Sequence, residues 1–412
     1  MDRLLSLLFL LLFILHLPRR SHQQHISSID RAALLSIKRT LDDIPGSNFF
    51  STWDFTAPDP CATFSGLTCS PDPYSSALRV TALQLGTGLS DSLGLLGSLS
   101  PHLSNLTELT QLVLFPGIVT GPIPPELGLL KNLRVISLTN NRLTGPIPQS
   151  LASLPNLHTL DVSYNQLTGS IPAELTELPQ MKVLILASNQ LTGELPSGWT
   201  QLLHLDLKMN GFAGRIPSNL PSTLRYLSLS KNRMWGPLNG LEKLSELVLL
   251  DISMNSFNGT IPSSLFRPSL NSMLLQRNKL SGAIPPGPAD ESYGPGSVID
   301  LSHNFLTGEL PATLVGVENL FLNNNHLIGK VPEEYVKRVF SGTTKTLYLQ
   351  HNYITEFPME EGLNLPDSVS LCLSYNCMVP PVGLSACPAS AGGQLSRPAF
   401  QCAVFNNGTT MA

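Results

Sequence analysis

Leucine and isoleucine recur at fixed intervals along most of the chain, and an asparagine closes each interval. The clearest copy, at 133–148, reads Leu-x-x-Ile-x-Leu-x-x-Asn-x-Leu-x-Gly-x-Ile-Pro. The closing asparagines are Asn141, Asn165, Asn189, Asn210, Asn232, Asn255, Asn278, Asn304, Asn325, Asn352 and Asn376, and two earlier copies carry Gly88 and Gly117. A period of roughly 24 residues predicts a solenoid of stacked coils rather than a set of globular domains.

Each copy predicts one coil. Leu160 and Val162 alternate with polar neighbours, which is typical of a half-buried strand. One such strand cannot bury its apolar face alone, so we expect successive strands to stack about 4.8 Å apart. The Asn165 amide can both donate to and accept from the backbone where the chain turns inward. Residues 173–178 then predict a short helical return on the convex side.

The segment that follows each asparagine carries a family resemblance. Its Gly-x-Ile-Pro motif occurs at Gly121–Pro124, Gly145–Pro148, Gly169–Pro172, Gly214–Pro217, Gly259–Pro262 and Gly282–Pro285. The chain resembles plant extracellular leucine-rich repeat proteins of the receptor-like ectodomain type, which are related to polygalacturonase-inhibiting proteins. The resemblance implies an α/β solenoid, a right-handed superhelix of about 13 repeats with a parallel concave sheet and disulfide caps at both ends. The copy at Asn232 departs from the motif, which predicts an irregular outer strand there.

Four regions follow from this reading: a signal peptide at 1–25, an N-terminal cap at 26–79, repeats at 80–376, and a C-terminal cap and tail at 377–412. A cation before a short apolar run is typical of a secretory signal. No later segment offers 18 consecutive apolar residues, so we expect no membrane span. Secretion would permit disulfides and N-glycosylation at the sequons of Asn105, Asn258 and Asn407.

Three segments outside the motif also predict structure. Residues 27–43 indicate an amphipathic helix with Leu34, Ile37 and Leu41 on one face. Residues 333–340 indicate a short convex helix, and the Pro- and Gly-rich residues 285–296 a protruding loop.

The six cysteines lie near the two ends. The family resemblance implies a disulfide between Cys61 and Cys69 in the N-terminal cap. Three pairings are possible among the last four, which are Cys372, Cys377, Cys387 and Cys402. An extended path from Cys372 to Cys377 spans roughly 15 Å, whereas disulfides need Cα atoms within about 7 Å, which disfavours that pair. The spacing also lacks the close pairs that are typical of zinc sites.

Composition narrows the function. Charged residues make up 13% of the 412 residues and the net charge is −4, without the concentrated field that nucleic-acid binding requires. Kinase motifs are absent from the sequence. We therefore expect no nucleic-acid partner and no kinase activity.

One strand position faces the concave surface in every coil and carries four carboxylates. From the first coils onward it reads Val113, Ser137, Asp161, Ile185, Asp206, Ser228, Asp251, Leu274, Asp300, Phe321 and Tyr348. Carboxylates two coils apart lie about 10 Å from each other, which exceeds the spacing of a retaining glycosidase pair and allows an inverting one. The sequence Leu-Asp-Leu-Ser is also common in the family, so these aspartates do not by themselves indicate catalysis. We expect no enzyme activity, no cofactor and no metal.

The late coils offer the best candidate for ligand binding. Phe321 and Tyr348 fall on adjacent strands, and polar side chains surround them. The surrounding candidates are Asn323, Gln350, His303 and His351. Aromatic anchors among amide groups are typical of protein and peptide contacts.

These observations predict a secreted, glycosylated binding module of the plant apoplast or cell wall. We expect it to bind a protein or peptide ligand, to be monomeric when free, and to signal through a partner membrane receptor kinase. The alternative is an inhibitor of microbial cell-wall-degrading enzymes, similar to polygalacturonase-inhibiting proteins, although these usually have about ten repeats.

Overall fold

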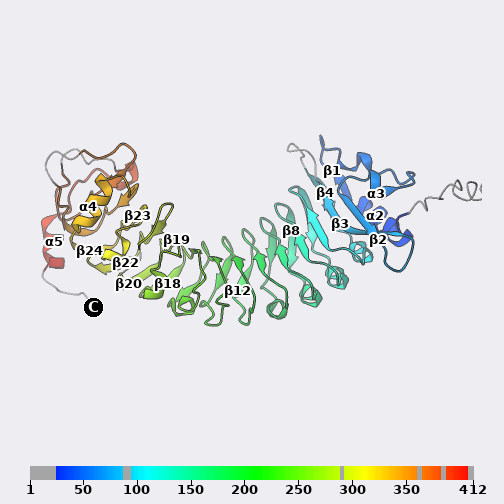
Figure 1. Cartoon of the computed structure of the whole chain (residues 1–412), viewed down its shortest axis with the longest axis horizontal. Helices are drawn as coiled ribbons and strands as arrows, with labels where there is room; N and C mark the ends of the chain where they lie inside the picture. Colours follow the sequence, from blue (N-terminus) through cyan, green and yellow to red (C-terminus); the bar gives the residue numbers. More distant parts are fainter. Residues whose placement is uncertain (1–24, 87–93, 288–291, 360–363, 382–386, 407–412) are drawn as a thin grey trace, which may run out of the picture.

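The computed structural model describes residues 25–86, 94–287, 292–359, 364–381 and 387–406, which form an open arc (Figure 1). The expected signal peptide, apart from residue 25, and Asn407 lie outside these residues. Within the described part of the chain, no helix is long and apolar enough to cross a membrane.

The inner face of the arc is one 14-stranded sheet. Its strands are β2 (Leu67–Pro71), β3 (Leu78–Leu85), β5 (Gln111–Leu114), β7 (Val135–Ser137), β9 (Thr159–Asp161), β11 (Val183–Ile185), β13 (His204–Asp206), β15 (Tyr226–Ser228), β17 (Leu249–Asp251), β19 (Ser272–Leu274), β21 (Val298–Asp300), β23 (Asn319–Phe321), β25 (Thr346–Tyr348) and β27 (Ser370–Cys372). Strands β3 to β27 pair in parallel and in chain order, and β2 pairs antiparallel to β3. The expected solenoid of about 13 repeats with a parallel concave sheet is confirmed.

Short outer strands form three further sheets in the described residues, and those from Arg142 onward follow the asparagine turns. They are β1 (Leu41–Asp43), β4 (Leu95–Ser98), β6 (Ile118–Pro122), β8 (Arg142–Pro146) and β10 (Gln166–Thr168); β12 (Thr192–Glu194) and β14 (Gly211–Ala213); and β16 (Trp235–Gly236), β18 (Ser256–Gly259), β20 (Lys279–Ala283), β22 (Phe305–Gly308), β24 (His326–Lys330) and β26 (Tyr353–Glu356). The strand after Asn232, β16, is only 2 residues long, so the irregularity predicted there is present.

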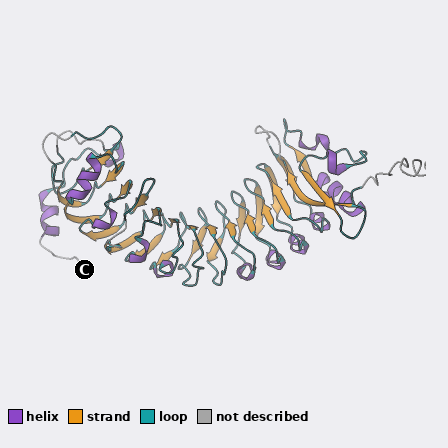
Figure 2. Ribbon diagram, viewed as in Figure 1, coloured by secondary structure: helices purple, strands orange, loops and turns teal. Residues whose placement is uncertain are grey.

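Helical turns close most coils on the outer, convex side (Figure 2). The 3₁₀ turns are η1 (Phe49–Thr52), η2 (Pro101–Asn105), η3 (Pro125–Leu129), η4 (Gln149–Ser153), η5 (Ala173–Glu177), η6 (Asn239–Leu241), η7 (Ser263–Leu265), η8 (Ala312–Leu314) and η9 (Ala389–Ala391), and the α-helices are α2 (Ser28–Thr40), α3 (Pro60–Thr63), α4 (Glu333–Phe340) and α5 (Ala399–Asn406). Helix α4 has the predicted bounds.

The core is a continuous column of leucine side chains between the inner sheet and the helical turns. Leu160 pairs with Ile136 on one side and with Leu184 on the other, and all three are fully buried. Each coil therefore buries its apolar face only against its neighbours, as the repeat requires.

The asparagines at the turns join neighbouring coils. Asn165, 8% exposed, accepts a hydrogen bond from the Leu143 N–H at 2.9 Å through Oδ1. Its Nδ2 donates to the carbonyls of Leu138, Val162 and Ser163 at 2.9–3.1 Å. The same pattern recurs through to Asn376. These amides satisfy buried backbone groups that the turn leaves unpaired.

Gly117 replaces the asparagine in an early coil for a steric reason. A Cβ at this position would lie 2.6 Å from the carbonyl oxygen of Leu95. The backbone of the preceding coil approaches too closely for any side chain.

The N-terminal cap covers the first coil. Its helix ends at Thr40, three residues before the predicted end at Asp43, because residues 41–43 instead form a strand antiparallel to β4. The cap contains the disulfide Cys61–Cys69, and Trp53 stacks on Phe64 with ring centroids 5.0 Å apart.

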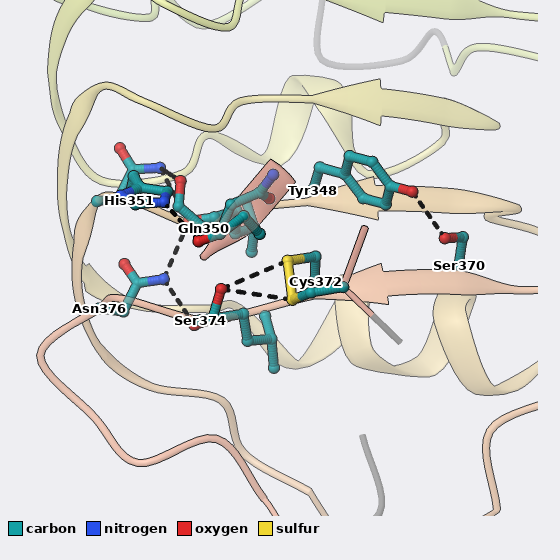
Figure 3. The surroundings of a disulfide bond; sticks show 12 residues. Tyr348, Gln350, His351, Ser370, Cys372, Ser374 and Asn376 are labelled. Carbon is teal, nitrogen blue, oxygen red and sulfur yellow. Dashed lines mark hydrogen bonds between the residues drawn. A yellow bond between two sulfur atoms is a disulfide. The ribbon is translucent and has the colours of Figure 1, made fainter. Parts of the chain in front are cut away.

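The C-terminal cap is joined to the last coil by two disulfides, Cys372–Cys387 and Cys377–Cys402. These lie near the chain's end, so the expected disulfide caps are present at both ends. Figure 3 shows the surroundings of Cys372. Cys372 lies on β27, the last inner strand, so the cap is fastened directly to the concave sheet.

Candidate functional site

Phe321 and Tyr348 form the aromatic centre of the candidate site. They are directly paired across strands β23 and β25, and their rings meet edge to face with centroids 5.3 Å apart. The Tyr348 hydroxyl lies 2.9 Å from Ser370 Oγ on β27, within hydrogen-bonding distance. Both aromatic side chains are half-buried, so their remaining surface faces the concave side of a rigid sheet. Such edge-to-face pairs are well suited to anchor a ligand.

Gln350 and Asn323 lie beneath this surface rather than on it. They are 4% and 8% exposed, and Gln350 Oε1 has no hydrogen-bond partner among the described residues. Both stand two residues before the coil's asparagine, a position that is buried in most coils. Its occupants are mainly small, as at Ser163 and Ala187, and this was the sequence signal for burial.

The two histidines lie at the turns, with φ of 55° for His303 and 60° for His351. His351 Nε2 donates to the Ala391 carbonyl at 2.9 Å, so the cap already engages this ring. Burial, with a further contribution from Arg277, lowers the pKa of His303 and favours its neutral form. The structure therefore leaves Phe321, Tyr348 and the two histidines partly exposed, whereas Asn323 and Gln350 are buried.

The four carboxylates of the concave column cap their own turns. Asp161 Oδ1 accepts from the Ser163 N–H at 3.0 Å, and Asp300 Oδ1 from the Ser302 N–H at 2.9 Å. Asp206 and Asp251 do the same, each at 3.1 Å. Burial raises the pKa of Asp300. These contacts give the carboxylates a structural role in the turn.

A second cluster, which the sequence analysis did not single out, lies at the centre of the inner sheet. His204 and Tyr226, on paired strands β13 and β15, stack with centroids 4.0 Å apart. Burial lowers the pKa of His204 and raises that of Tyr226, so both rings stay neutral near pH 7. Beside them, Lys208 Nζ contacts Asp206 Oδ2 at 3.1 Å. Their recurrence at equivalent strand positions of adjacent coils was the available signal.

No group of three or more histidine, cysteine or acidic side chains suited to a metal ion occurs among the described residues. The sequon asparagines Asn105 and Asn258 are both exposed.

Family models match three parts of the chain. The leucine rich repeat N-terminal domain matches residues 27–70, and leucine rich repeat models match residues 131–191 and 246–267. No curated protein matches the sequence.

Solved structures show the same architecture. The chain is 30% identical to the ectodomain of the Arabidopsis thaliana receptor kinase GASSHO1/SCHENGEN3, solved with CASPARIAN STRIP INTEGRITY FACTOR 2, with a TM-score of 0.71 over 85% of this chain and 44% of that one. It is 29% identical to the Arabidopsis receptor kinase HAESA, solved with the peptide hormone IDA and the co-receptor SERK1, with a TM-score of 0.67 over 85% of this chain and 58% of that one. A plant ice-binding protein is 26% identical, with a TM-score of 0.54 over 75% of this chain and 90% of that one.

The chain thus spans about half the length of the receptor chains it resembles. Together, the sheet, the N-terminal domain and the repeats identify it as a leucine-rich repeat solenoid that is structurally similar to the ectodomains of plant receptor kinases.

Proposed function

We propose that the chain is a secreted, non-enzymatic leucine-rich repeat module that binds a protein or peptide on its concave sheet at the plant cell surface or wall, and that signals through a partner receptor kinase. The observation that carries this proposal is the half-exposed Phe321–Tyr348 pair on adjacent strands. Two similar structures were solved with CASPARIAN STRIP INTEGRITY FACTOR 2 and with the peptide hormone IDA, which supports this class of ligand.

The extracellular location is supported by the chemistry of the caps. The described residues contain three disulfides and no free cysteine, which is typical of oxidising compartments. The exposed Asn105 and Asn258 would be accessible to glycosylation there.

The test is ligand capture from apoplastic fluid by the immobilised full chain. Replacement of Phe321 and Tyr348 by Ser should abolish capture without reducing secretion. Phe305→Ser is the matched control, because Phe305 is 50% exposed on the outer sheet, and it should leave capture unchanged. Equal capture by all three proteins would remove the aromatic pair from the proposal.

A second assay distinguishes the proposed function from the alternative, which is inhibition of wall-degrading enzymes. Titration against fungal polygalacturonase should leave the enzyme's activity unchanged. Stoichiometric inhibition would replace the receptor-type proposal by an inhibitor of wall-degrading enzymes.

A further inference from the structure

A row of cations lies along the edge of the inner sheet where its strands begin, away from the Phe321–Tyr348 pair. Arg134, Lys182 and Arg225 each directly precede an inner strand, namely β7, β11 and β15. Their backbones belong to one hydrogen-bonded ladder, in which each N–H at this position donates to the carbonyl of the equivalent residue one coil earlier. Its steps are His158 to Arg134 (2.8 Å), Lys182 to His158 (3.0 Å), Leu203 to Lys182 (2.9 Å) and Arg225 to Leu203 (2.9 Å).

The three cations therefore occupy every second coil. With strands about 4.8 Å apart, successive cations along the row are separated by roughly 10 Å. Among the described residues, none of the three makes an ion pair, whereas Lys208 on the same sheet is paired with Asp206. We call Arg134, Lys182 and Arg225 the basic row.

Neutral and apolar groups lie beside the basic row. Leu203 is 36% exposed at the ladder position between Lys182 and Arg225, and the His204–Tyr226 stack lies on the adjoining strands. Gln180 is exposed on the other side and lines, with Arg134 and His158, a hollow of about 410 Å³. The surface thus combines spaced positive charge with an aromatic platform and amide groups.

This combination fits one kind of ligand. We propose that the basic row binds an extended, proline-containing peptide with an acidic residue at every third position. A polyproline II helix has three residues per turn and rises about 3.1 Å per residue, so acids at i, i+3 and i+6 lie on one side about 9.3 Å apart. That spacing matches cations on alternate coils. Proline rings would pack on the His204–Tyr226 stack and Leu203, as aromatic-lined grooves receive polyproline II segments.

A peptide suits the surface better than a polyuronate does. The exposed Leu203 gives an aliphatic contact that a chain of charged sugars would not use, and the Gln180 amide can pair with a peptide backbone. The proposal rests on the proposed function, because it names the class of peptide that such a module would take.

The test uses the full chain and fluorescent peptides of one composition. The first peptide carries Glu at every third position among Pro and Ala, and the second carries the same glutamates in one block. Fluorescence anisotropy should show tighter binding of the first peptide, weakening as salt is raised. The triple variant Arg134→Gln/Lys182→Gln/Arg225→Gln should lose about 10- to 100-fold in affinity, since three exposed charge pairs are removed.

The control variant is Arg142→Gln/Arg233→Gln/Lys279→Gln, which removes three exposed cations beside the outer strands and changes the net charge equally. It should lose less than about twofold in affinity. An equal loss in both variants, or equal binding of the block peptide, would overturn the proposal. Binding of polygalacturonate without binding of the spaced peptide would also overturn it, in favour of an anionic polysaccharide.

Capture from apoplastic fluid distinguishes the two proposals. If the basic-row variant captures native ligand as well as the unaltered chain does, the row plays no part and the proposed function stands. If the unaltered chain captures no protein or peptide, the proposed function itself fails.

Discussion

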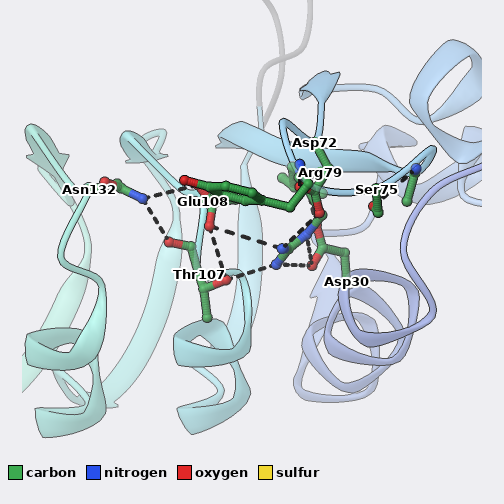
Figure 4. Close-up of polar contacts among 10 residues, drawn as sticks. Asp30, Asp72, Ser75, Arg79, Thr107, Glu108 and Asn132 are labelled. Atoms are coloured by element: carbon green, nitrogen blue, oxygen red, sulfur yellow. Dashed lines mark hydrogen bonds and ion pairs between the residues drawn. The ribbon is translucent and has the colours of Figure 1, made fainter.

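Arg79 holds the carboxylate of Asp30, 49 residues earlier in the sequence, at the junction between the N-terminal cap and the first coil (Figure 4). Arg79 Nε donates to both Asp30 oxygens at 3.1 Å, and Nη2 donates to Oδ1 at 3.0 Å. Asp30 is fully buried and also accepts from the Val80 N–H at 2.7 Å. The cap helix is thereby tied to strand β3 by a charge pair withdrawn from water.

Removing one partner of this pair should be costly. Arg79→Met leaves the Asp30 carboxylate buried without its cation, and we expect a loss of about 3–5 kcal/mol in the free energy of unfolding. Chemical denaturation followed by circular dichroism measures this loss. Lys38→Met, which breaks an exposed pair with Asp42, is the control and should cost less than about 1 kcal/mol. Similar losses in the two variants would contradict a special role for the buried pair.

The stability of the fold should depend strongly on the amide side chains of the turn asparagines, because each one bonds two neighbouring coils. Asn165→Ala should destabilise the fold by roughly 3 kcal/mol, because the Leu143 N–H and the Leu138 carbonyl lose their partner in a buried turn. The carbonyls of Val162 and Ser163 each lose one of two donors. Asn156→Ala, at an exposed residue with one hydrogen bond to the Lys131 carbonyl, should cost about 1 kcal/mol or less. Thermal unfolding of the two variants provides the comparison, and equal midpoints would show that the turn amides contribute little.

His204 should make stability fall in mild acid. Burial lowers its pKa in the folded state, so below the ordinary value of about 6.5 the unfolded chain binds a proton that the folded chain does not. Stability is therefore lost as pH falls from about 7 towards the lower, folded-state pKa. His204→Gln removes the ionisable ring, so it should reduce the difference in denaturation midpoint between pH 7.5 and pH 5. His102→Gln, at an exposed ring, is the control for loss of an imidazole, and the prediction is wrong if the two variants behave alike.

The Cys372–Cys387 disulfide should hold the C-terminal cap against the last coil. Its removal opens a closure of 15 residues and should cost about 3 kcal/mol, with loss of the contact between His351 and the Ala391 carbonyl. Hydrogen exchange of a double Ser variant should rise at Tyr375, whose N–H bonds the Leu395 carbonyl in the cap. Exchange at Leu160, in the middle of the sheet, serves as the internal control and should not change. Unchanged protection at Tyr375 would show that the cap stays in place without the bond.

The repeat period predicted most of the fold because each coil is held by its nearest neighbours. The bounds of α4 were predicted correctly from local pattern alone, since its charged and apolar residues alternate at a helical period. The end of α2 was predicted wrongly, because Leu41–Asp43 forms a strand that pairs with residues 95–97. The local sequence pattern carries no signal for a strand partner so far away in the chain. Residues 288–291 of the Pro- and Gly-rich segment 285–296, which was predicted to protrude, lie outside the described residues. Tyr293 near its end is 5% exposed and belongs to the core.

The candidate site was predicted in outline only. Register placed Phe321 opposite Tyr348, because coils of regular length bring equivalent positions together. The burial of Gln350 and the engagement of His351 depend on how side chains pack between coils and on a cap that folds back over 40 residues. The His204–Tyr226 stack could have been found by the same register argument, because the two residues occupy the first position of adjacent inner strands.

The hydrogen bonds of the turn asparagines also allow one whole coil to be removed without leaving the others unpaired. Asn141, Asn165 and Asn189 each bond the coil before them, and the intervals between them are all 24 residues. Excising one such interval would leave the remaining amides with equivalent partners, and it would shorten the arc by one strand spacing of about 4.8 Å. The distance between the N-terminal and C-terminal caps is therefore adjustable in steps of one coil.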